Sequence, residues 1–307
     1  MAEGPYRARA AAIIAGAQRL ANRRCRPDHP CRLAVAGRGA AGAACYVCTP
    51  RKDGESQSKR FGGKTALVVG GNSGIGLACA ERLASEGARV VIAGRDPATL
   101  ASAAQRIGSG AIGVRTDIAD TASIDGLIAE VRRHFGTLDV LVVSAGIGAF
   151  VPVRQITEAD WDTVHGINLR GVFFTTQKAL ALMQRGSAIV LVGSIGAEMG
   201  LAGNMMYATA KAGVRALGRN LAAELVGEGI RVNVVSPGPV ETPIIRRNIG
   251  LPPEAEHELR KLMIQHVPMH RMGEPQEVAA AVAFLAAGEA SFITGVDLYV
   301  DGGSVSF

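Results

Sequence analysis

TALVVGGNSGIG, residues 65–76, is the stretch that decides the fold class. Residues 65–70 form a short, continuous apolar run, which is typical of a strand buried on both faces. A glycine-rich turn follows and leads into a helical pattern over residues 75–85. Glycine lets a backbone approach a ligand closely, and the free N–H groups and positive dipole end of a helix N-terminus attract phosphate. The stretch therefore predicts a pyrophosphate-binding turn formed by Gly70, Asn72, Ser73, Gly74, Ile75 and Gly76.

Further apolar runs repeat this strand–helix pattern along the chain, at residues 88–93, 111–115, 138–143, 187–192, 230–235 and 296–300. Helical patterns fill the gaps between them, and strands that alternate with helices indicate a parallel sheet covered on both faces. Right-handed crossovers then make the fold α/β and doubly wound, with seven parallel strands. Residues 61–307 contain no internal repeat or low-complexity linker, so we expect a single domain there.

The composition excludes several classes of protein. With 48% hydrophobic and 20% charged residues, the chain is too apolar to be disordered. It has no apolar run near the roughly 20 residues that cross a bilayer. The formal net charge of +6 is concentrated at one end, because residues 1–60 carry 12 of the 33 Lys and Arg but only 4 of the 27 Asp and Glu. The rest of the chain is slightly acidic, so we expect neither a nucleic-acid partner nor a membrane.

Residues 1–60 are rich in Arg and Ala and hold four of the five cysteines. We expect a flexible basic extension, with a transit-type segment or translated upstream sequence as alternatives. The spacing of Cys45 and Cys48 invites a zinc site, but nothing around it resembles a small zinc-binding unit, so we expect unstructured thiols and no metal. Cys79 is the single cysteine beyond residue 60, which favours a reducing compartment and a cytoplasmic protein.

The end of the second predicted strand indicates which dinucleotide binds. A carboxylate at this corner would accept a hydrogen bond from the ribose 2′-hydroxyl of NAD. The sequence has Gly94-Arg95-Asp96 there, and a guanidinium can pair with a 2′-phosphate in a bidentate way. Arg95 therefore favours NADP over NAD as the cofactor, and the alternative is a solvated arginine at a strand end.

A tyrosine and a lysine lie one helical turn apart in the helical pattern over residues 204–226. The i,i+4 spacing of Tyr207 and Lys211 places both side chains on one face of the helix. A phenol with a pKa near ~10 is a poor acid at neutral pH, and a neighbouring ammonium lowers that pKa. Ser194 ends a buried strand, where its hydroxyl can donate to a carbonyl oxygen beside the tyrosine. Asn168 interrupts an apolar helical pattern, either as a buried structural amide or as the holder of a water in a proton relay to Lys211.

Together these residues resemble the short-chain dehydrogenase/reductase family, in the branch with a core of about 250 residues that includes 3-oxoacyl-carrier-protein reductases and glucose 1-dehydrogenases. The resemblance covers residues 61–307. Asp117 is similar to the family's adenine contact, and Ser144-Ala145-Gly146 to the end of its Asn-Asn-Ala-Gly turn. SPGPVET at residues 236–242 resembles its Pro-Gly loop beside the nicotinamide, and residues 271–275 and 294–303 resemble its C-terminal signature.

The resemblance implies a Rossmann fold, a homotetramer, and an NAD(P)-dependent oxidoreductase that transfers a hydride between the nicotinamide and a secondary alcohol or ketone. Tyr207 would be the general acid and base. Lys211 would lower the pKa of Tyr207 and hold the nicotinamide ribose, Ser194 would polarise the carbonyl, and Asn168 would complete the relay. Besides the glycine turn, Arg95, Tyr207 and Lys211, the residues implied to contact the cofactor are Asp117, Ile118, Ser144, Ala145, Gly146, Pro237, Gly238, Val240 and Thr242.

Two positions depart from the family pattern. Val69 stands where the family usually has Thr, and Val143 where it usually has the first Asn of its turn. Losing both ends of a buried polar link can be nearly neutral, whereas losing one end is costly. We therefore expect a joint exchange of polar for apolar packing at the floor of the cleft.

The sequence leaves alternatives open for both the substrate and the reaction class. Residues 243–270, where the family has a mobile lid, are largely apolar, which favours a hydrophobic alcohol or ketone. Arg246, Arg247 and Lys261 leave an anionic or carrier-linked substrate open. A related lyase or isomerase, and a dinucleotide-binding regulatory protein that has lost activity, are the two alternatives to a dehydrogenase.

Overall fold

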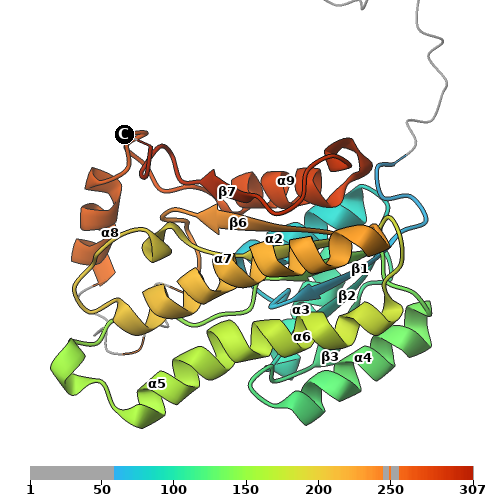
Figure 1. Cartoon of the computed structure of the whole chain (residues 1–307), viewed down its shortest axis with the longest axis horizontal. Helices are drawn as coiled ribbons and strands as arrows, with labels where there is room; N and C mark the ends of the chain where they lie inside the picture. The colour runs from blue at the N-terminus through green and yellow to red at the C-terminus, as the bar shows by residue number, and fades with distance from the viewer. Residues whose placement is uncertain (1–58, 245–248, 250–255, 307) are drawn as a thin grey trace, which may run out of the picture. The chain divides into compact units, whose positions relative to one another are not determined.

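A seven-stranded sheet, all of whose strands run parallel, forms the middle layer of the molecule, in the order β3-β2-β1-β4-β5-β6-β7 (Figure 1). The computed structural model describes residues 59–244, 249 and 256–306. Each predicted strand is present, with bounds within two residues of those predicted. The strands are β1 (Thr65–Val69), β2 (Arg89–Gly94), β3 (Ile112–Arg115), β4 (Val140–Val143), β5 (Ala188–Val192), β6 (Arg231–Pro237) and β7 (Asp297–Val300).

Helices cover both faces of the sheet, which confirms the predicted doubly wound Rossmann architecture. α2 (Gly74–Ser85), α3 (Pro97–Ile107) and α9 (Pro275–Ala286) pack on one face. α4 (Thr121–Phe135), α6 (Gly171–Ala179) and α7 (Met205–Leu225) pack on the other, the face turned toward the viewer in Figure 1. Successive residues of β1 alternate between the two cores, because side chains of a strand point to opposite faces.

The carboxyl ends of β1 and β4 form the switch point of the sheet. The chain leaves β1 toward β2 and leaves β4 toward β5, in opposite directions along the sheet. A crevice opens at such a point in open α/β sheets, and ligands bind there. The two turns that border it touch, since the N–H of Ser144 donates to the carbonyl of Val69 at 2.9 Å. The glycine turn and the turn after β4 therefore face one another across the crevice.

A π-helical turn, Gly166–Arg170, links α5 (Glu158–His165) to α6. The N–H of Gly171 bonds to the carbonyl of Gly166, one residue farther back than in an α-helix. Such single π turns occur frequently at functional sites. Asn168 lies in this turn and is fully buried.

Several predictions fall on other parts of the chain. The described residues all belong to one compact unit, residues 58–307. The predictions for residues 1–58, including the cysteine spacing, lie outside the described residues and stay predictions. Over the described ranges, no helix has both the length and the apolar character needed to cross a bilayer.

Candidate active site

A cavity of about 1030 Å³ runs along the carboxyl ends of the strands. The structure brings the predicted site residues together on its wall, with two exceptions: Gly76 and Asn168. Gly76 lies behind the wall, where a Cβ would stand 2.1 Å from the carbonyl oxygen of Gly70. Gly76 therefore lets the first turn of α2 fold against the glycine loop, and the expectation that it contacts the cofactor is wrong on geometry.

The N-terminus of α2 faces this cavity through Ser73, Gly74 and Ile75. Ser73 precedes the helix in an extended conformation, and its side chain makes no capping hydrogen bond. The first N–H groups of a helix have no partner within the helix. These N–H groups, with the positive end of the helix dipole, fit an anion at this wall.

Arg95 lies at the wall beside the end of β2. Its side chain is exposed and has no hydrogen-bond or ion-pair partner within the described part of the chain. The neighbouring Asp96 instead caps α3, accepting hydrogen bonds from the N–H groups of Ala98 and Thr99. Asp117 follows β3, and its carboxylate accepts a hydrogen bond from the N–H of Ala119 at 3.0 Å. This end of the cavity thus offers one unpaired guanidinium to a ligand.

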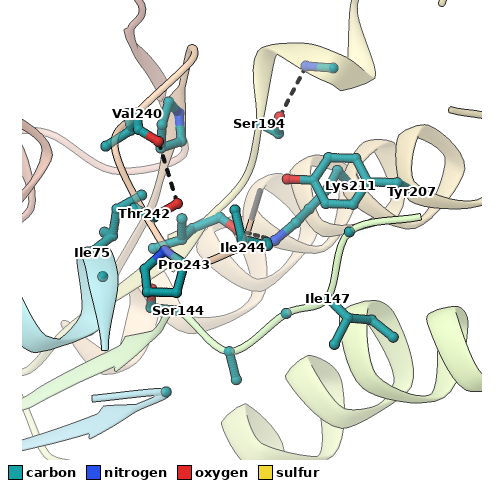
Figure 2. A pocket seen from close by; sticks show the side chains of 18 of the residues that line it. Ile75, Ser144, Ile147, Ser194, Tyr207, Lys211, Val240, Thr242, Pro243 and Ile244 are labelled. Carbon is teal, nitrogen blue, oxygen red and sulfur yellow. Dashed lines mark hydrogen bonds between the residues drawn. The ribbon is translucent and has the colours of Figure 1, made fainter. Parts of the chain in front are cut away.

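Tyr207, Lys211 and Ser194 meet at the other end of the cavity (Figure 2). The Ser194 hydroxyl lies beside Tyr207: a Cβ on Gly196 would stand 3.3 Å from Ser194 Oγ and 3.5 Å from Tyr207 Cε1. Ser194 Oγ accepts from the N–H of Gly196 at 3.0 Å. Lys211 Nζ lies 5.8 Å from the centre of the tyrosine ring and donates to the carbonyl oxygen of Val192 at 2.8 Å. The lysine is thus held against the end of β5, one helical turn from the phenol.

Burial governs the charge states of the Tyr207 hydroxyl and the Lys211 amine. Burial raises the pKa of the Tyr207 hydroxyl, and hydrogen bonding with Ser194 opposes that rise. Burial lowers the pKa of Lys211 to about 8. The predicted lowering of the phenol pKa by Lys211 is therefore wrong for this structure, because the ammonium is directed at Val192 and the ring is desolvated. At neutral pH the lysine keeps its proton and the tyrosine is a neutral donor.

Asn168 acts on the backbone of the turn after β4. Its Nδ2 donates to the carbonyl oxygen of Ile147, and its Oδ1 accepts from the N–H of Ile147, both at 2.8 Å. Asn168 Oδ1 and Lys211 Nζ also approach Gly146, at 3.3 Å and 3.6 Å from where a Cβ would stand. The structural amide that the sequence suggested is therefore present, and it lies beside Lys211 as the relay would require.

Val69 and Val143 are neighbours in the sheet. They are register partners of β1 and β4, and each is 1% exposed. Both belong to the apolar core under α4, α6 and α7. The two departures from the family pattern thus adjoin, as a joint exchange of polar for apolar packing requires.

Apolar side chains line the cavity near Tyr207. Among them are Ile147, Phe150, Met199 and Leu201, together with three residues of α8 (Glu256–Gln265): Leu259, Leu262 and Met263. Pro243 and Ile244 of the predicted lid also line it. Val267 is buried away from the cavity, Met269 is 65% exposed, and Ile245 and Leu251 lie outside the described residues.

An ionic network that the sequence did not predict surrounds Arg215. Arg215, one turn beyond Lys211 on α7, pairs with Glu198 and Asp297. Tyr299 donates to Glu198 at 2.8 Å, and Ser236 donates to Asp297 at 2.6 Å. The network joins α7, the segment after Ser194, the end of β6 and β7. The sequence signal was a charged residue four positions after Lys211, on the same helix face.

Comparisons with known proteins agree with this geometry. A family model described as enoyl-(acyl carrier protein) reductase matches residues 69–305. The oxidoreductase asL5 of Sarocladium schorii is 39% identical over 250 residues, which are 81% of this chain and 98% of that protein. The 3-oxoacyl-(acyl-carrier-protein) reductase FabG of Escherichia coli K12 is 38% identical over 249 residues, 79% of this chain and 98% of that protein.

The solved structures include a short-chain dehydrogenase/reductase of Serratia marcescens. It superimposes with a TM-score of 0.74 at 33% identity, over 80% of this chain and all of that one. The family model, the curated relatives and this structure all extend over most of the chain. With the doubly wound sheet and the Ser-Tyr-Lys set at its carboxyl edge, they show that this protein belongs to the short-chain dehydrogenase/reductase family of oxidoreductases.

Proposed function

We propose that this oxidoreductase uses NADP(H), in preference to NAD(H), to interconvert a secondary alcohol and a ketone. The observation that carries the proposal is that one cavity joins an anion-binding helix N-terminus to Tyr207, with Ser194 and Lys211 beside it. The extent of the cavity, about 1030 Å³, supports a ligand as long as a dinucleotide with substrate beside it.

The residues present fit a dinucleotide. The start of α2 would hold the pyrophosphate, and Arg95 would pair with a 2′-phosphate because its guanidinium has no other partner in the described residues. Asp117 and Ile118 would border the adenine, and Pro237 to Thr242 the nicotinamide. When bound, the cofactor supplies the hydride, and the protein supplies binding, orientation and proton transfer.

Proton transfer falls to the chain's own side chains. Ser194 would donate a hydrogen bond to the carbonyl oxygen, and Tyr207 would give that oxygen its proton in reduction and take it back in oxidation. The raised pKa of Tyr207 keeps the phenol protonated, as a general acid requires. Lys211 would hold the nicotinamide ribose, and Asn168 would hold the Gly146–Ile147 backbone in place beside it.

Substitution of Tyr207 by Phe tests the proposal. The change keeps the ring and removes the proton, so we expect near-complete loss of the absorbance change at about 340 nm with NADPH and ketones, while NADPH binding measured by fluorescence is largely kept. Unchanged turnover would reject the role of Tyr207. Cofactor binding without turnover over a broad panel of alcohols and ketones would favour a regulatory protein, and substrate conversion without a change at that wavelength would favour a lyase or isomerase.

The oligomeric state, the cellular location and the partners of the protein stay predictions. The homotetramer is proposed from family resemblance, and sedimentation or light scattering of the full chain measures it. The cytoplasmic location and the lack of a nucleic-acid partner follow from composition and charge, and this proposal does not depend on them.

A further inference from the structure

Asn204 is a buried amide that the mechanism above leaves unused. It stands immediately before α7, is 5% exposed and lines the cavity. Its side chain does not cap the helix. Its backbone is bonded, through its N–H to Leu201 and its carbonyl to the N–H of Ala208. The side-chain amide, however, has no hydrogen-bond partner in the part of the chain that the structure describes.

Two other asparagines are buried among the described residues, and both have bonded side-chain amides. Asn168 has both ends of its amide bonded to the backbone of Ile147. Asn233, 1% exposed in β6, donates to the carbonyl oxygen of Ile293 and accepts from the N–H of Val296. The Asn204 side chain differs from these two because its amide has no protein partner in the described residues and meets solvent in the cavity instead. Because Asn204 borders the cavity, its amide is free to hydrogen-bond a molecule that enters there.

The Asn204 amide lies close to Ser194 and Tyr207. Around Gly196, a Cβ would stand 3.2 Å from Asn204 Nδ2, 3.3 Å from Ser194 Oγ and 3.5 Å from Tyr207 Cε1. The amide, the serine hydroxyl and the tyrosine ring thus converge on one small region, which a side chain at residue 196 would crowd. A molecule whose carbonyl oxygen reaches Ser194 and Tyr207 would place its adjoining atoms near Asn204.

We propose that Asn204 is a specificity-determining residue that hydrogen-bonds a second oxygen of the substrate, close to the reacting carbon. An amide can donate to a carbonyl or hydroxyl oxygen and accept from a hydroxyl. The substrate class is therefore a ketone, or the matching alcohol, with a hydroxyl or oxo group on a carbon near the carbonyl. The inference rests on the proposed function and narrows its substrate. A site built around a hydrogen bond discriminates against an analogue that cannot make it.

The test compares butan-2-one with 3-hydroxybutan-2-one and 4-hydroxybutan-2-one, using NADPH and three forms of the full chain. The wild type should prefer the better hydroxyketone by about tenfold or more in kcat/KM, the size expected for one well-made hydrogen bond. Asn204→Leu should lose that preference, mainly through a raised KM for the hydroxyketone, so that the kcat/KM values of the hydroxyketone and of butan-2-one converge. Asn220→Leu, the same substitution at an exposed position of α7, should behave as the wild type.

Stability gives a second measurement that does not need turnover. Because the Asn204 side chain makes no hydrogen bond to the described protein residues, the melting temperature of Asn204→Leu should be unchanged or higher. If that variant fails to fold, Asn204→Ala, which removes both the donor and the acceptor of the amide, takes its place in the comparison. Equal preference in the wild type and the variant, with turnover intact, overturns the inference and leaves the proposed function standing. No turnover of any ketone in the wild type overturns the proposed function, and this inference with it.

Discussion

Replacing Lys211 by Met should change how the stability of the protein depends on pH. Lys211 is 3% exposed, and burial lowers its pKa from 10.5 to about 8. The difference corresponds to about 3 kcal/mol of destabilisation at neutral pH, because folding must bury a charge that the unfolded chain leaves in water. Methionine has a similar length and no charge, so the variant removes this cost together with the hydrogen bond to Val192.

The sign of the pH effect follows from the two pKa values. The folded state releases the lysine proton near pH 8, whereas the unfolded chain keeps it up to pH 10.5. Between these values the unfolded state binds more protons, so the stability of the wild type rises with pH. Relative to Lys211→Met, the unfolding free energy of the wild type should increase by about 2 kcal/mol between pH 7 and pH 9.5.

Urea unfolding of both proteins at the two pH values measures this difference. The pKa of the Cys79 thiol is raised by burial to about 12, but the thiol is present in both proteins and its contribution cancels. Lys178→Met, at a lysine of α6 paired with Asp125 on the surface, is the matched control and should show no such change. If the difference in unfolding free energy between the wild type and Lys211→Met stays constant across this pH range, the predicted pKa effect of Lys211 is refuted.

Three further substitutions test other parts of the site. Arg95→Gln should raise the KM for NADPH by about tenfold and leave that for NADH nearly unchanged, because only the former has a 2′-phosphate; clear preference of the wild type for NADH in steady-state rates would contradict the assignment. Val69→Thr should lower the unfolding free energy by about 1 kcal/mol in urea titrations, since its hydroxyl would meet Val143 in the core, and a clear rise would contradict the joint exchange. Arg215→Leu should raise the KM for the ketone more than the KM for NADPH, since Glu198 lies in the segment that carries Met199 and Leu201 to the substrate end; equal effects on both would indicate a general loss of structure.

The fold could be predicted from the sequence because its signals are local. The run at residues 65–70 is apolar throughout, and β1 is indeed buried on both faces. The other strands carry comparable runs, and strands alternating with helices admit few topologies once crossovers are right-handed. The wall of the cavity was equally predictable, because the fold gathers the residues that follow parallel strands at one edge of the sheet.

The partners of individual side chains could not be predicted in this way. Arg215 could have pointed to solvent, and its choice of Glu198 and Asp297 depends on contacts between segments far apart in the chain. The prediction of a lowered pKa for Tyr207 was wrong for the same reason. The i,i+4 spacing places Lys211 on the same helix face, but it does not say that the ammonium reaches the end of β5 or that the ring is buried.

The polar groups at the catalytic end are held by the backbone of the turns more than by one another. Asn168 is bonded to Ile147, Lys211 to the carbonyl of Val192, and Ser194 to the N–H of Gly196. Their positions therefore depend on the paths of the chain after β4 and β5. Those paths are set by the parallel register of the strands, which valine maintains at residues 69 and 143. An apolar pair between β1 and β4 can thus replace a polar link without moving the proposed catalytic groups, and for this reason we expect the two departures to leave the chemistry in place.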